Sequence, residues 1–568
     1  MFQTKLRVDK EWPGGFEAGL EIRIDNQIID GWEIELRFDQ AVLLDVWLGD
    51  LRSKTDDRIF VYRNKDWNAQ LSAGSVFDFK FVAHNGVAPH NLVCAFFNGK
   101  SILTSSSEVA NASQTTTSSQ STLASSTSTS LIILNGKYNY GEVLRMSLLF
   151  YESQRAGKLP ANNRIIWRGD SMLMDKGQNG EDLTGGYFDG GDYVKFGFPM
   201  ASFTTLLAWG ALDYEDAYQH SGQLHHVREA IRWSTDYFIK AHVSEYEFYG
   251  QVGDGYDDHA SWSRPEDWTK PRPAWKVTRQ QPGSDLLAET AAALAAASLV
   301  FRSSDPSYAS TLLIHARQLY DFANQYRGKY SDSIPNAANF YNSWSGYGDE
   351  LGWSAAWLLH ATGEQGYQTD VEKHYAEFEL DRQPQEFSWD DKTAGVQLLM
   401  AKITQKLTYR QQVENFCNYI VRQAPKTPKG LVYLDQWGTL RHAANVAFLC
   451  LQAADIGINT QEYLTFASQQ IGYILGDSGR SYVIGFGHNY PQRPHHRSRQ
   501  VDSICDWSAF NNPGPNPQLL IGALIGGPDR NDNYEDRRDD YVKNEVATDY
   551  NAGFQSAVAG LLHYQLKG

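Results

Sequence analysis

The chain has 568 residues, of which 42% are hydrophobic and 21% charged, and its formal net charge is −16 at pH 7. This length exceeds one ordinary domain, and the composition is that of folded globular proteins. The negative charge argues against nucleic acid and membranes as partners, because anionic polymers and lipids are bound by clustered Lys and Arg. The sequence contains no run of about 20 apolar residues, so no membrane-spanning helix is predicted.

Aromatic residues and cysteines narrow the function further. The 16 Trp and 31 Tyr are more than core packing usually requires, and flat rings with a polar handle suit the apolar faces of sugars. The four cysteines, Cys94, Cys417, Cys450 and Cys505, show no C-x-x-C spacing. Neither a zinc site nor a disulfide scaffold is therefore indicated.

Residues 1–103 are predicted to form a small all-β sandwich. Apolar and polar residues alternate over 20–24, 32–38 and 77–81. This two-residue period is typical of strands with one buried face.

Three tryptophans of this segment, Trp12, Trp47 and Trp67, are flanked by polar or turn residues. Burial is the commoner state of any single tryptophan. Three in such settings favour exposure instead, and exposed rings at separate loops or edges would form a flat stacking surface.

Ser and Thr dominate residues 104–130, which contain few apolar side chains. Such a stretch cannot bury enough surface to offset the entropy of ordering it. We therefore predict a flexible linker over 104–132, followed by a second domain over 133–568.

The second domain is predicted to be helical, because its hydrophobic period changes to about 3.6 residues. The predicted helices cover 142–154, 203–214, 227–241, 285–301, 310–326, 352–362, 371–380, 393–405, 410–423, 442–455, 461–475 and 552–564. A dozen helices joined by long aromatic loops predict a toroid of paired helices, with a cleft built by the loops at one end.

Two aspartates and a distant glutamate are the most informative residues of these loops. Asp189 and Asp192 are separated by two glycines, and Glu545 follows far along the chain. Cleavage of a glycosidic bond needs one carboxylic acid on the leaving oxygen and one carboxylate on the other face of the sugar. The glycines would let the backbone turn sharply, so that both aspartates point into one cleft. An ordinary Asp/Gly turn is the alternative.

Basic and aromatic residues accompany the carboxylates. His495 and Arg497 follow Pro494 two residues apart, so both would lie on one side of an extended segment and donate hydrogen bonds to sugar hydroxyls. A solvated basic loop is the alternative. The segments 258–262 and 434–441 each add an aromatic residue and a polar donor, which suits a sugar subsite or loop packing.

Residues 340–350 gather oxygen donors before a predicted helix, including Asp349 and Glu350. Together with Asp390 or Asp391 they would bind calcium, which prefers several carboxylate and carbonyl oxygens. Acidic residues at a helix start also need no metal, because they complement the helix dipole. The sequence leaves these two explanations equal.

Residues from about 136 to 568 resemble glycoside hydrolase family 9, the inverting cellulases with an (α/α)6 barrel. Five blocks match in the family's order, at 163–171, 189–196, 282–284, 494–497 and 534–551. Gly190 departs mildly from the family, which often has Ala there.

The first segment resembles a family 2 carbohydrate-binding module, whose three stacking tryptophans match Trp12, Trp47 and Trp67. It departs from many such modules because it has only Cys94 and so lacks their usual terminal disulfide.

The resemblance implies a role for each matching residue. Asp192 would be the general base, Asp189 its partner in holding the water, and Glu545 the general acid. Residues that would assist them or bind the central sugars are His495, Asp536, Arg497, His259, Arg441 and Tyr550. Residues that would stack along the cleft are Trp262, Tyr341, Phe387 and Trp437. Residues matching the calcium ligands of some family members are Ser345, Gly346, Asp349, Glu350 and Asp390.

The resemblance therefore implies a secreted, monomeric endo-β-1,4-glucanase that acts on cellulose and soluble β-1,4-glucans and needs no cofactor for its chemistry. Residues 1–8 lack the apolar run of a secretory signal, so export follows another route or the signal is missing from this chain. One alternative is an enzyme for mixed-linkage glucan or xylan, which the shape of the subsites decides. The other is a cellulose-binding protein that no longer cuts, against which the three carboxylates argue.

Overall fold

The computed structural model describes residues 3–12, 15–24, 29–38, 42–46, 49–55, 58–65, 70–71, 75–84, 92–98, 100–104, 137–498 and 505–567. The chain divides into two compact units, residues 1–126 and 127–568. Apart from Thr104, the predicted linker lies outside the described residues, so its boundaries stay a prediction.

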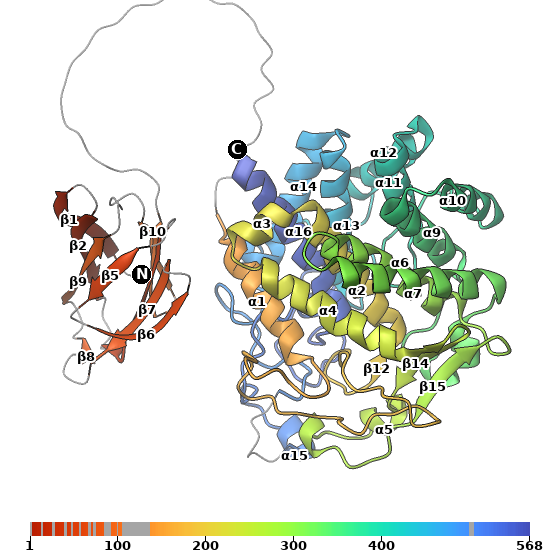
Figure 1. Ribbon diagram of the computed structural model, residues 1–568, viewed down its shortest axis with the longest axis horizontal. Coiled ribbons are helices and arrows are strands. Elements are labelled where there is room, and N and C mark those ends of the chain that lie inside the picture. Colours follow the sequence, from red (N-terminus) through yellow and green to blue (C-terminus); the bar gives the residue numbers. More distant parts are fainter. Residues whose placement is uncertain are drawn as a thin grey trace, which may run out of the picture. The chain divides into compact units, whose positions relative to one another are not determined.

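The first unit consists of antiparallel strands in two main sheets (Figure 1). One sheet has the order β1 (Gln3–Trp12), β2 (Gly15–Arg23), β9 (Val76–His84) and β5 (Leu43–Val46). The other has the order β11 (Lys100–Thr104), β10 (Leu92–Phe97), β4 (Glu33–Phe38), β7 (Ile59–Asn64) and β6 (Gly49–Thr55). Strands β3 (Ile29–Asp30) and β8 (Gln70–Leu71) form a separate pair.

Alternate side chains of the two sheets form one core. Leu20 lies opposite Phe79 in the register of β2 with β9, and Leu36 lies opposite Phe60 in the register of β4 with β7. All four are buried in one hydrophobic cluster. The predicted two-residue period and all-β fold of this segment are thus confirmed.

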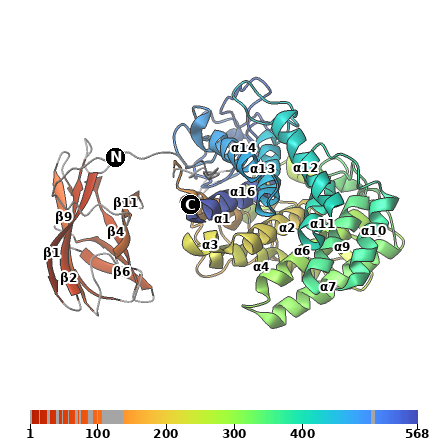
Figure 2. The ribbon, with the colours of Figure 1, turned by 90° about the horizontal axis from the view of Figure 1, so that it is seen from above.

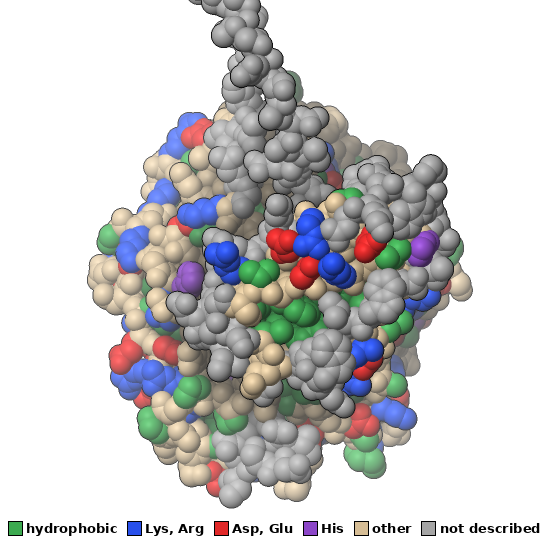
Figure 3. Space-filling model, turned by 90° about the vertical axis from the view of Figure 1, so that its left-hand side faces the viewer, with side chains coloured by type: hydrophobic (Ala, Val, Ile, Leu, Met, Phe, Trp, Pro, Cys, Tyr) green, Lys and Arg blue, Asp and Glu red, His purple; other side chains and the backbone are tan. Residues whose placement is uncertain are grey.

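The surface of the first unit carries charges of both signs. Arg7 pairs with Glu21 and Asp78. In Figure 3, acidic and basic side chains are interspersed on the visible face. Of the three predicted stacking tryptophans, Trp47 and Trp67 lie outside the described residues, and Trp12 is described only as the last backbone position of β1.

The second unit is built on an inner ring of helices (Figures 1 and 2). Its members are α2 (Gly197–Asp213), α6 (Ser284–Phe301), α9 (Gly348–Thr362), α11 (Thr393–Thr404), α13 (Thr439–Asp455) and α16 (Thr548–Lys567). Each contacts the next in this order, and α16 contacts α2, which closes the ring.

An outer helix packs against each inner one. The pairs are α1 (Tyr140–Ser153) on α16, α4 (Leu224–Ala241) on α2, α7 (Pro306–Gln325) on α6, α10 (Gln365–Glu377) on α9, α12 (Leu407–Arg422) on α11, and α14 (Thr460–Gly472) on α13. Six inner and six outer helices within residues 137–567, apart from the gap at 499–504, form the predicted (α/α)6 barrel.

The two rings differ in sequence because they differ in burial. Outer helix α12 buries Val413, Phe416, Cys417 and Ile420, the spacing of a one-sided apolar stripe. Inner helix α6 is apolar on all sides and meets the length and composition of a membrane span, with a mean hydropathy of 1.4. Since 94% of it is buried within the unit, its hydrophobicity serves the core of the barrel.

All twelve predicted helices occur, although several boundaries differ. Helix α2 begins at Gly197, six residues before the predicted start, and α14 gives way to a π-helical segment, Tyr473–Asp477. The prediction did not include the short helices α3 (Glu215–His220), α5 (Gly255–His259), α8 (Tyr330–Ser333) and α15 (Trp507–Phe510). It also did not include the small sheet of β12 (Lys195–Phe196), β13 (His242–Ser244), β14 (Glu247–Val252) and β15 (Ala274–Thr278).

Candidate active site

The segments that carry the three predicted carboxylates meet where inner helices begin. Asp189 and Asp192 precede α2, and Glu545 precedes α16. The backbone carbonyl of Asp189 accepts a hydrogen bond from the N–H of Thr548 at 2.8 Å. One backbone contact thus joins segments that are more than 350 positions apart.

Gly190 and Gly191 lie in a bend of the chain, and they also make this approach possible. Neither glycine has a positive φ. A Cβ at Gly190 would lie 2.5 Å from the carbonyl oxygen of Val546, and one at Gly191 would lie 2.5 Å from that of His495. The predicted turn is present, since the N–H of Asp189 donates to the carbonyl oxygen of Val194 at 3.2 Å. The glycines have a second role that was not predicted, because they admit two neighbouring backbones.

Asp189 is buried among other carboxylates. Its Oδ2 accepts a hydrogen bond from the Tyr341 hydroxyl at 2.5 Å, and its Oδ1 has no hydrogen-bond partner among the described residues. Burial, followed by the charges of Asp192 and Asp549, raises the pKa of Asp189 well above its usual range. Asp189 therefore keeps its proton to a higher pH than an exposed aspartate.

Asp192 has a different electrostatic environment from Asp189. Burial and the charge of Asp258 raise the pKa of Asp192, while His259 and Arg497 lower it, and the balance lies at about 7. Because cations favour its charged form, Asp192 is the member of the pair that ionises first.

Glu545 is held by two aromatic side chains. The indole N–H of Trp437 and the hydroxyl of Tyr550 both donate to Oε2, the latter at 2.9 Å. Burial raises the pKa of Glu545, and these hydrogen bonds only partly oppose it. A protonated Glu545 is thus favoured over a wider pH range than in water.

His495 is held by the backbone of another loop. Its Nδ1 lies 2.8 Å from the carbonyl oxygen of Arg538, and burial lowers its pKa to about 4, so the ring is neutral. With Nδ1 donating, Nε2 is an acceptor. In this tautomer Nε2 would accept a hydrogen bond from a sugar hydroxyl instead of donating one, and a contact of His495 with sugar stays a prediction. Asp536 accepts the backbone N–H groups of Gln492 and Arg493, each at 2.9 Å, and so fixes this loop.

Both predicted arginines form buried ion pairs. Arg497 donates to the carboxylate of Asp258 at 3.0 Å and to its carbonyl oxygen at 3.1 Å. Arg441 donates to Asp549 at 2.7 Å. Sequence reasoning assigned no role to Asp258 or Asp549, since nothing local reveals a partner so far along the chain.

The predicted stacking residues differ in exposure. Phe387 is 1% exposed and packs against Trp353 at 6.1 Å, so it is a core residue rather than a surface for a sugar. Trp262 is 7% exposed. Trp437 is 41% exposed and lies 5.7 Å from Tyr541, which is itself 54% exposed.

Two exposed aromatic residues near these groups were not predicted as site residues. Tyr541 belongs to the block that contains Glu545, and its ring lies 6.2 Å from that of His495. Trp507 opens α15 and is 47% exposed. Exposed aromatic residues within or close after a recognised block are the signal that would have found them.

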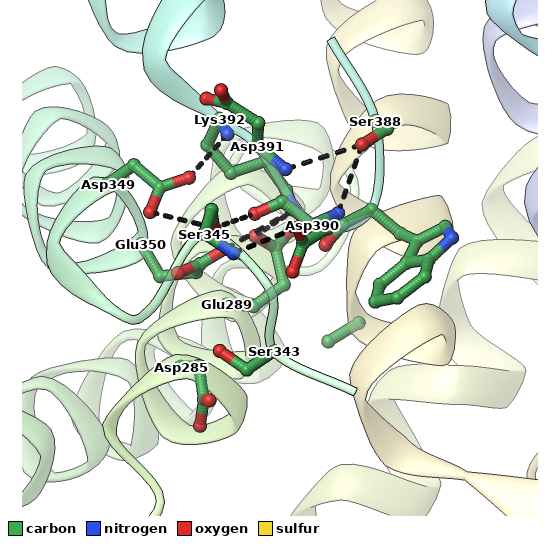
Figure 4. Close-up of polar contacts among 12 residues, drawn as sticks. Asp285, Glu289, Ser343, Ser345, Asp349, Glu350, Ser388, Asp390, Asp391 and Lys392 are labelled. Atoms are coloured by element: carbon green, nitrogen blue, oxygen red, sulfur yellow. Dashed lines mark hydrogen bonds and ion pairs between the residues drawn. The ribbon is translucent and has the colours of Figure 1, made fainter. Parts of the chain in front are cut away.

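The predicted calcium ligands gather at the start of α9 (Figure 4). The carboxylate of Asp390 accepts the backbone N–H groups of Trp344 at 2.8 Å and Ser345 at 3.0 Å. The Ser345 hydroxyl donates to the carbonyl oxygen of Asp390 at 2.6 Å. Asp349 accepts the backbone N–H of Lys392 at 2.6 Å.

Buried carboxyl groups outnumber basic side chains in this cluster. Burial raises the pKa of Asp349 to about 7 and that of Asp390 to about 6, and raises that of Glu350 well above its usual range. Lys392 Nζ lies 3.6 Å from Glu350 and 3.5 Å from Glu289. One lysine does not neutralise all of these carboxyl groups if they ionise, and a calcium ion would supply the missing positive charge.

The arrangement of the donors does not by itself show a metal site. In the described parts of the chain, no three His, Cys, Asp or Glu side chains are grouped to hold a metal ion. The carbonyl oxygen of Gly346, another predicted ligand, accepts a hydrogen bond from the Ser343 hydroxyl. Calcium therefore stays a prediction, and the dipole of α9 stays its alternative.

Known proteins resemble both units. The family model "Glycosyl hydrolase family 9" matches residues 140–558, and "Cellulose binding domain" matches residues 2–101. Endoglucanase A of Bacillus pumilus is 47% identical over 447 residues, which cover 75% of this chain and 66% of that protein.

Solved structures are similar to the second unit. The endoglucanase from the termite Nasutitermes takasagoensis is 58% identical, with a TM-score of 0.74, over 75% of this chain and 99% of that one. Endoglucanase CelQ from Clostridium thermocellum, solved with cellotetraose, is 36% identical, with a TM-score of 0.67, over 75% of this chain and 71% of that one.

The cluster at α9 predicts a pH-dependent effect of calcium on stability. Since the pKa values of Asp349 and Asp390 are raised, the folded protein keeps protons that the unfolded chain loses between about pH 4 and 7. The free energy of unfolding therefore falls as pH rises through this window. Calcium would oppose the fall by binding ionised carboxylates, so millimolar calcium should raise Tm more at pH 7 than at pH 5.

Thermal unfolding with calcium and with a chelator would measure this shift. Free calcium at a hundred times its Kd would raise the free energy of unfolding by about 2.7 kcal/mol. Asp390→Asn should remove the shift, whereas Glu372→Gln on outer helix α10, whose side chain pairs with Lys406 at 2.6 Å, should retain it. If the curves with calcium and with chelator superimpose at both pH values, calcium does not bind, and the helix dipole and Lys392 explain the acidic residues.

Proposed function

Because the chain belongs to glycosyl hydrolase family 9, we propose that it is an inverting endo-β-1,4-glucanase acting on cellulose and soluble β-1,4-glucans. The observation that carries the proposal is the hydrogen bond from Thr548 to Asp189, which joins the paired aspartates to the segment of Glu545. Inverting hydrolysis needs a base and an acid on opposite faces of one sugar. The endoglucanase names of the relatives support the same activity.

In this mechanism Asp192 is the general base. Arg497 and His259 favour its ionised form, whereas the Tyr341 hydroxyl is the one side-chain donor to Asp189 among the described residues, and Asp189 keeps its proton to a higher pH. The two aspartates hold one water molecule. As its oxygen attacks the anomeric carbon, the water gives a proton to Asp192.

Glu545 is the general acid. Burial raises its pKa and so favours the protonated form to a higher pH, and Trp437 and Tyr550 fix the carboxyl group by their hydrogen bonds to Oε2. Its proton passes to the glycosidic oxygen as the bond to the anomeric carbon breaks. The cycle ends with Glu545 ionised and Asp192 protonated, so each must exchange one proton with solvent.

We further propose that the first unit binds cellulose, that the enzyme acts outside the cell, and that it acts as a monomer. The match of residues 2–101 to a cellulose binding domain supports the first point. A tethered module raises the concentration of the catalytic unit at an insoluble surface without altering its chemistry. Calcium would be a structural ion only, held by the cluster at α9.

Substitution of the acid and of the base should give different patterns of rescue. Glu545→Gln and Asp192→Asn should each lower the hydrolysis of carboxymethylcellulose by about 10²- to 10⁴-fold. An aryl cellobioside with a good leaving group needs little protonation, so it should restore the rate of Glu545→Gln far more than that of Asp192→Asn. Reducing-sugar and aryl-release assays measure the two effects, and equal rescue would contradict the assigned roles.

The stereochemistry of the first product tests the single displacement. Water attacks opposite the leaving group, so a β-linked glucan should first release an α-configured reducing end. Proton NMR of cellopentaose digests, recorded before the anomers interconvert, would show it. A β-anomer appearing first would refute the mechanism.

The predicted stacking surface of the first unit should affect activity on insoluble cellulose and not on soluble substrates. Changing Trp12, Trp47 and Trp67 to Ala should lower activity on crystalline cellulose, because the enzyme no longer concentrates there. Turnover of soluble carboxymethylcellulose should change little. A parallel loss on both substrates would show that the two units are not independent.

A further inference from the structure

A cluster of four rings lies beside the catalytic loop. The ring of Trp262 lies 5.3 Å from that of His495, 4.9 Å from that of Phe510 and 6.1 Å from that of Trp507. Phe510 also contacts Trp507 edge-on at 5.4 Å. The cluster thus connects α15 to His495, which belongs to the proposed active site.

Within this cluster, Trp507 offers an accessible face and Trp262 does not. Trp262 is 7% exposed, because the guanidinium of Arg497 lies over its ring at 5.3 Å and the rings of His495 and Phe510 meet it edge-on. Trp507 is 47% exposed. Trp507 is therefore better suited than Trp262 to the stacking role that was predicted for Trp262.

Backbone hydrogen bonds hold Trp507 in place. The Asp506 carboxylate accepts the N–H groups of Ser508 at 2.9 Å and Ala509 at 3.3 Å at the start of α15. At its other end, the buried guanidinium of Arg538 donates to four carbonyl oxygens, those of Ala509, Phe510, Asn512 and Gly514. An aromatic side chain on so fixed a support loses little entropy when it binds a ligand.

Arg538 also links this support to the catalytic loop. Its carbonyl oxygen accepts the hydrogen bond from His495 Nδ1. Ring contacts continue from His495 to Tyr541 at 6.2 Å, and from Tyr541 to Trp437, the donor to Glu545, at 5.7 Å. A chain of ring contacts therefore connects Trp437, which donates to Glu545, with Trp507.

We propose that Trp507 is a sugar-binding platform that extends the cleft beyond Trp262 and gives the enzyme a preference for longer β-1,4-glucan chains. This inference rests on the proposed endoglucanase function. A single exposed tryptophan is ordinary on a protein surface. Here the ring of Trp507 contacts Trp262 and Phe510, and Arg538 holds the far end of the short helix that carries it. Ring contacts also connect Trp507 to the residues around the proposed general acid. Flat apolar rings of this kind suit the face of a glucosyl unit.

The test compares cello-oligosaccharides from cellotriose to cellohexaose on the full-length protein. Trp507→Ala should lower kcat/KM roughly three- to tenfold for the longest substrates, the size of one aromatic contact, and leave the shortest within about twofold. Trp507→Phe should retain most of the preference for long chains. Leu407→Ala, which removes an exposed apolar side chain on outer helix α12, is the matched control and should change no substrate.

Each other outcome overturns the inference. Equal losses on all lengths, with a lowered Tm, would assign Trp507 a structural role. Unchanged kinetics at every length would show that no sugar reaches it. If the wild-type protein cleaves none of the oligosaccharides, the proposed function fails first, which separates that failure from the failure of this subsite.

Discussion

The site depends on one close approach between backbones. The loop of Asp189 meets the start of α16 through the hydrogen bond from Thr548, and it can do so only because Gly190 and Gly191 present no Cβ to the carbonyl oxygens of Val546 and His495. The closed inner ring supplies the frame, since α2 and α16 are neighbours. Main-chain contacts thus hold together the segments that carry the proposed base and the proposed acid.

Burial and neighbouring charges then give these carboxyl groups different pKa values, although the sequence alone does not distinguish them. Asp189 and Asp192 are three residues apart, yet only Asp192 has Arg497 and His259 to favour its charge. Glu545 is held by donors that favour its charged form, but burial outweighs them. Neighbouring groups with pKa values pushed apart by their surroundings are how one site obtains both an acid and a base near neutral pH.

Sequence patterns predicted the features of the fold that depend on local hydrophobic periodicity, and the matching sequence blocks predicted the family. The twelve helices, the β-rich first unit, the family and the barrel are confirmed. These patterns did not predict contacts between residues that are far apart in the sequence. Phe387 stands in a polar loop but is buried against Trp353, while Asp258 and Asp549 pair with arginines more than 100 positions away. The second role of the glycines was likewise invisible, because it depends on backbones that arrive from elsewhere.

The closed ring also sets an order of events during synthesis. Helix α16 follows the five other inner helices along the chain, and both α13 and α2 need its apolar side chains as partners. Until it emerges from the ribosome, two inner helices expose surface that only α16 covers, which is where nascent chains recruit chaperones or aggregate. Glu545 lies three residues before this helix, so the proposed general acid and the helix that closes the ring are synthesised together.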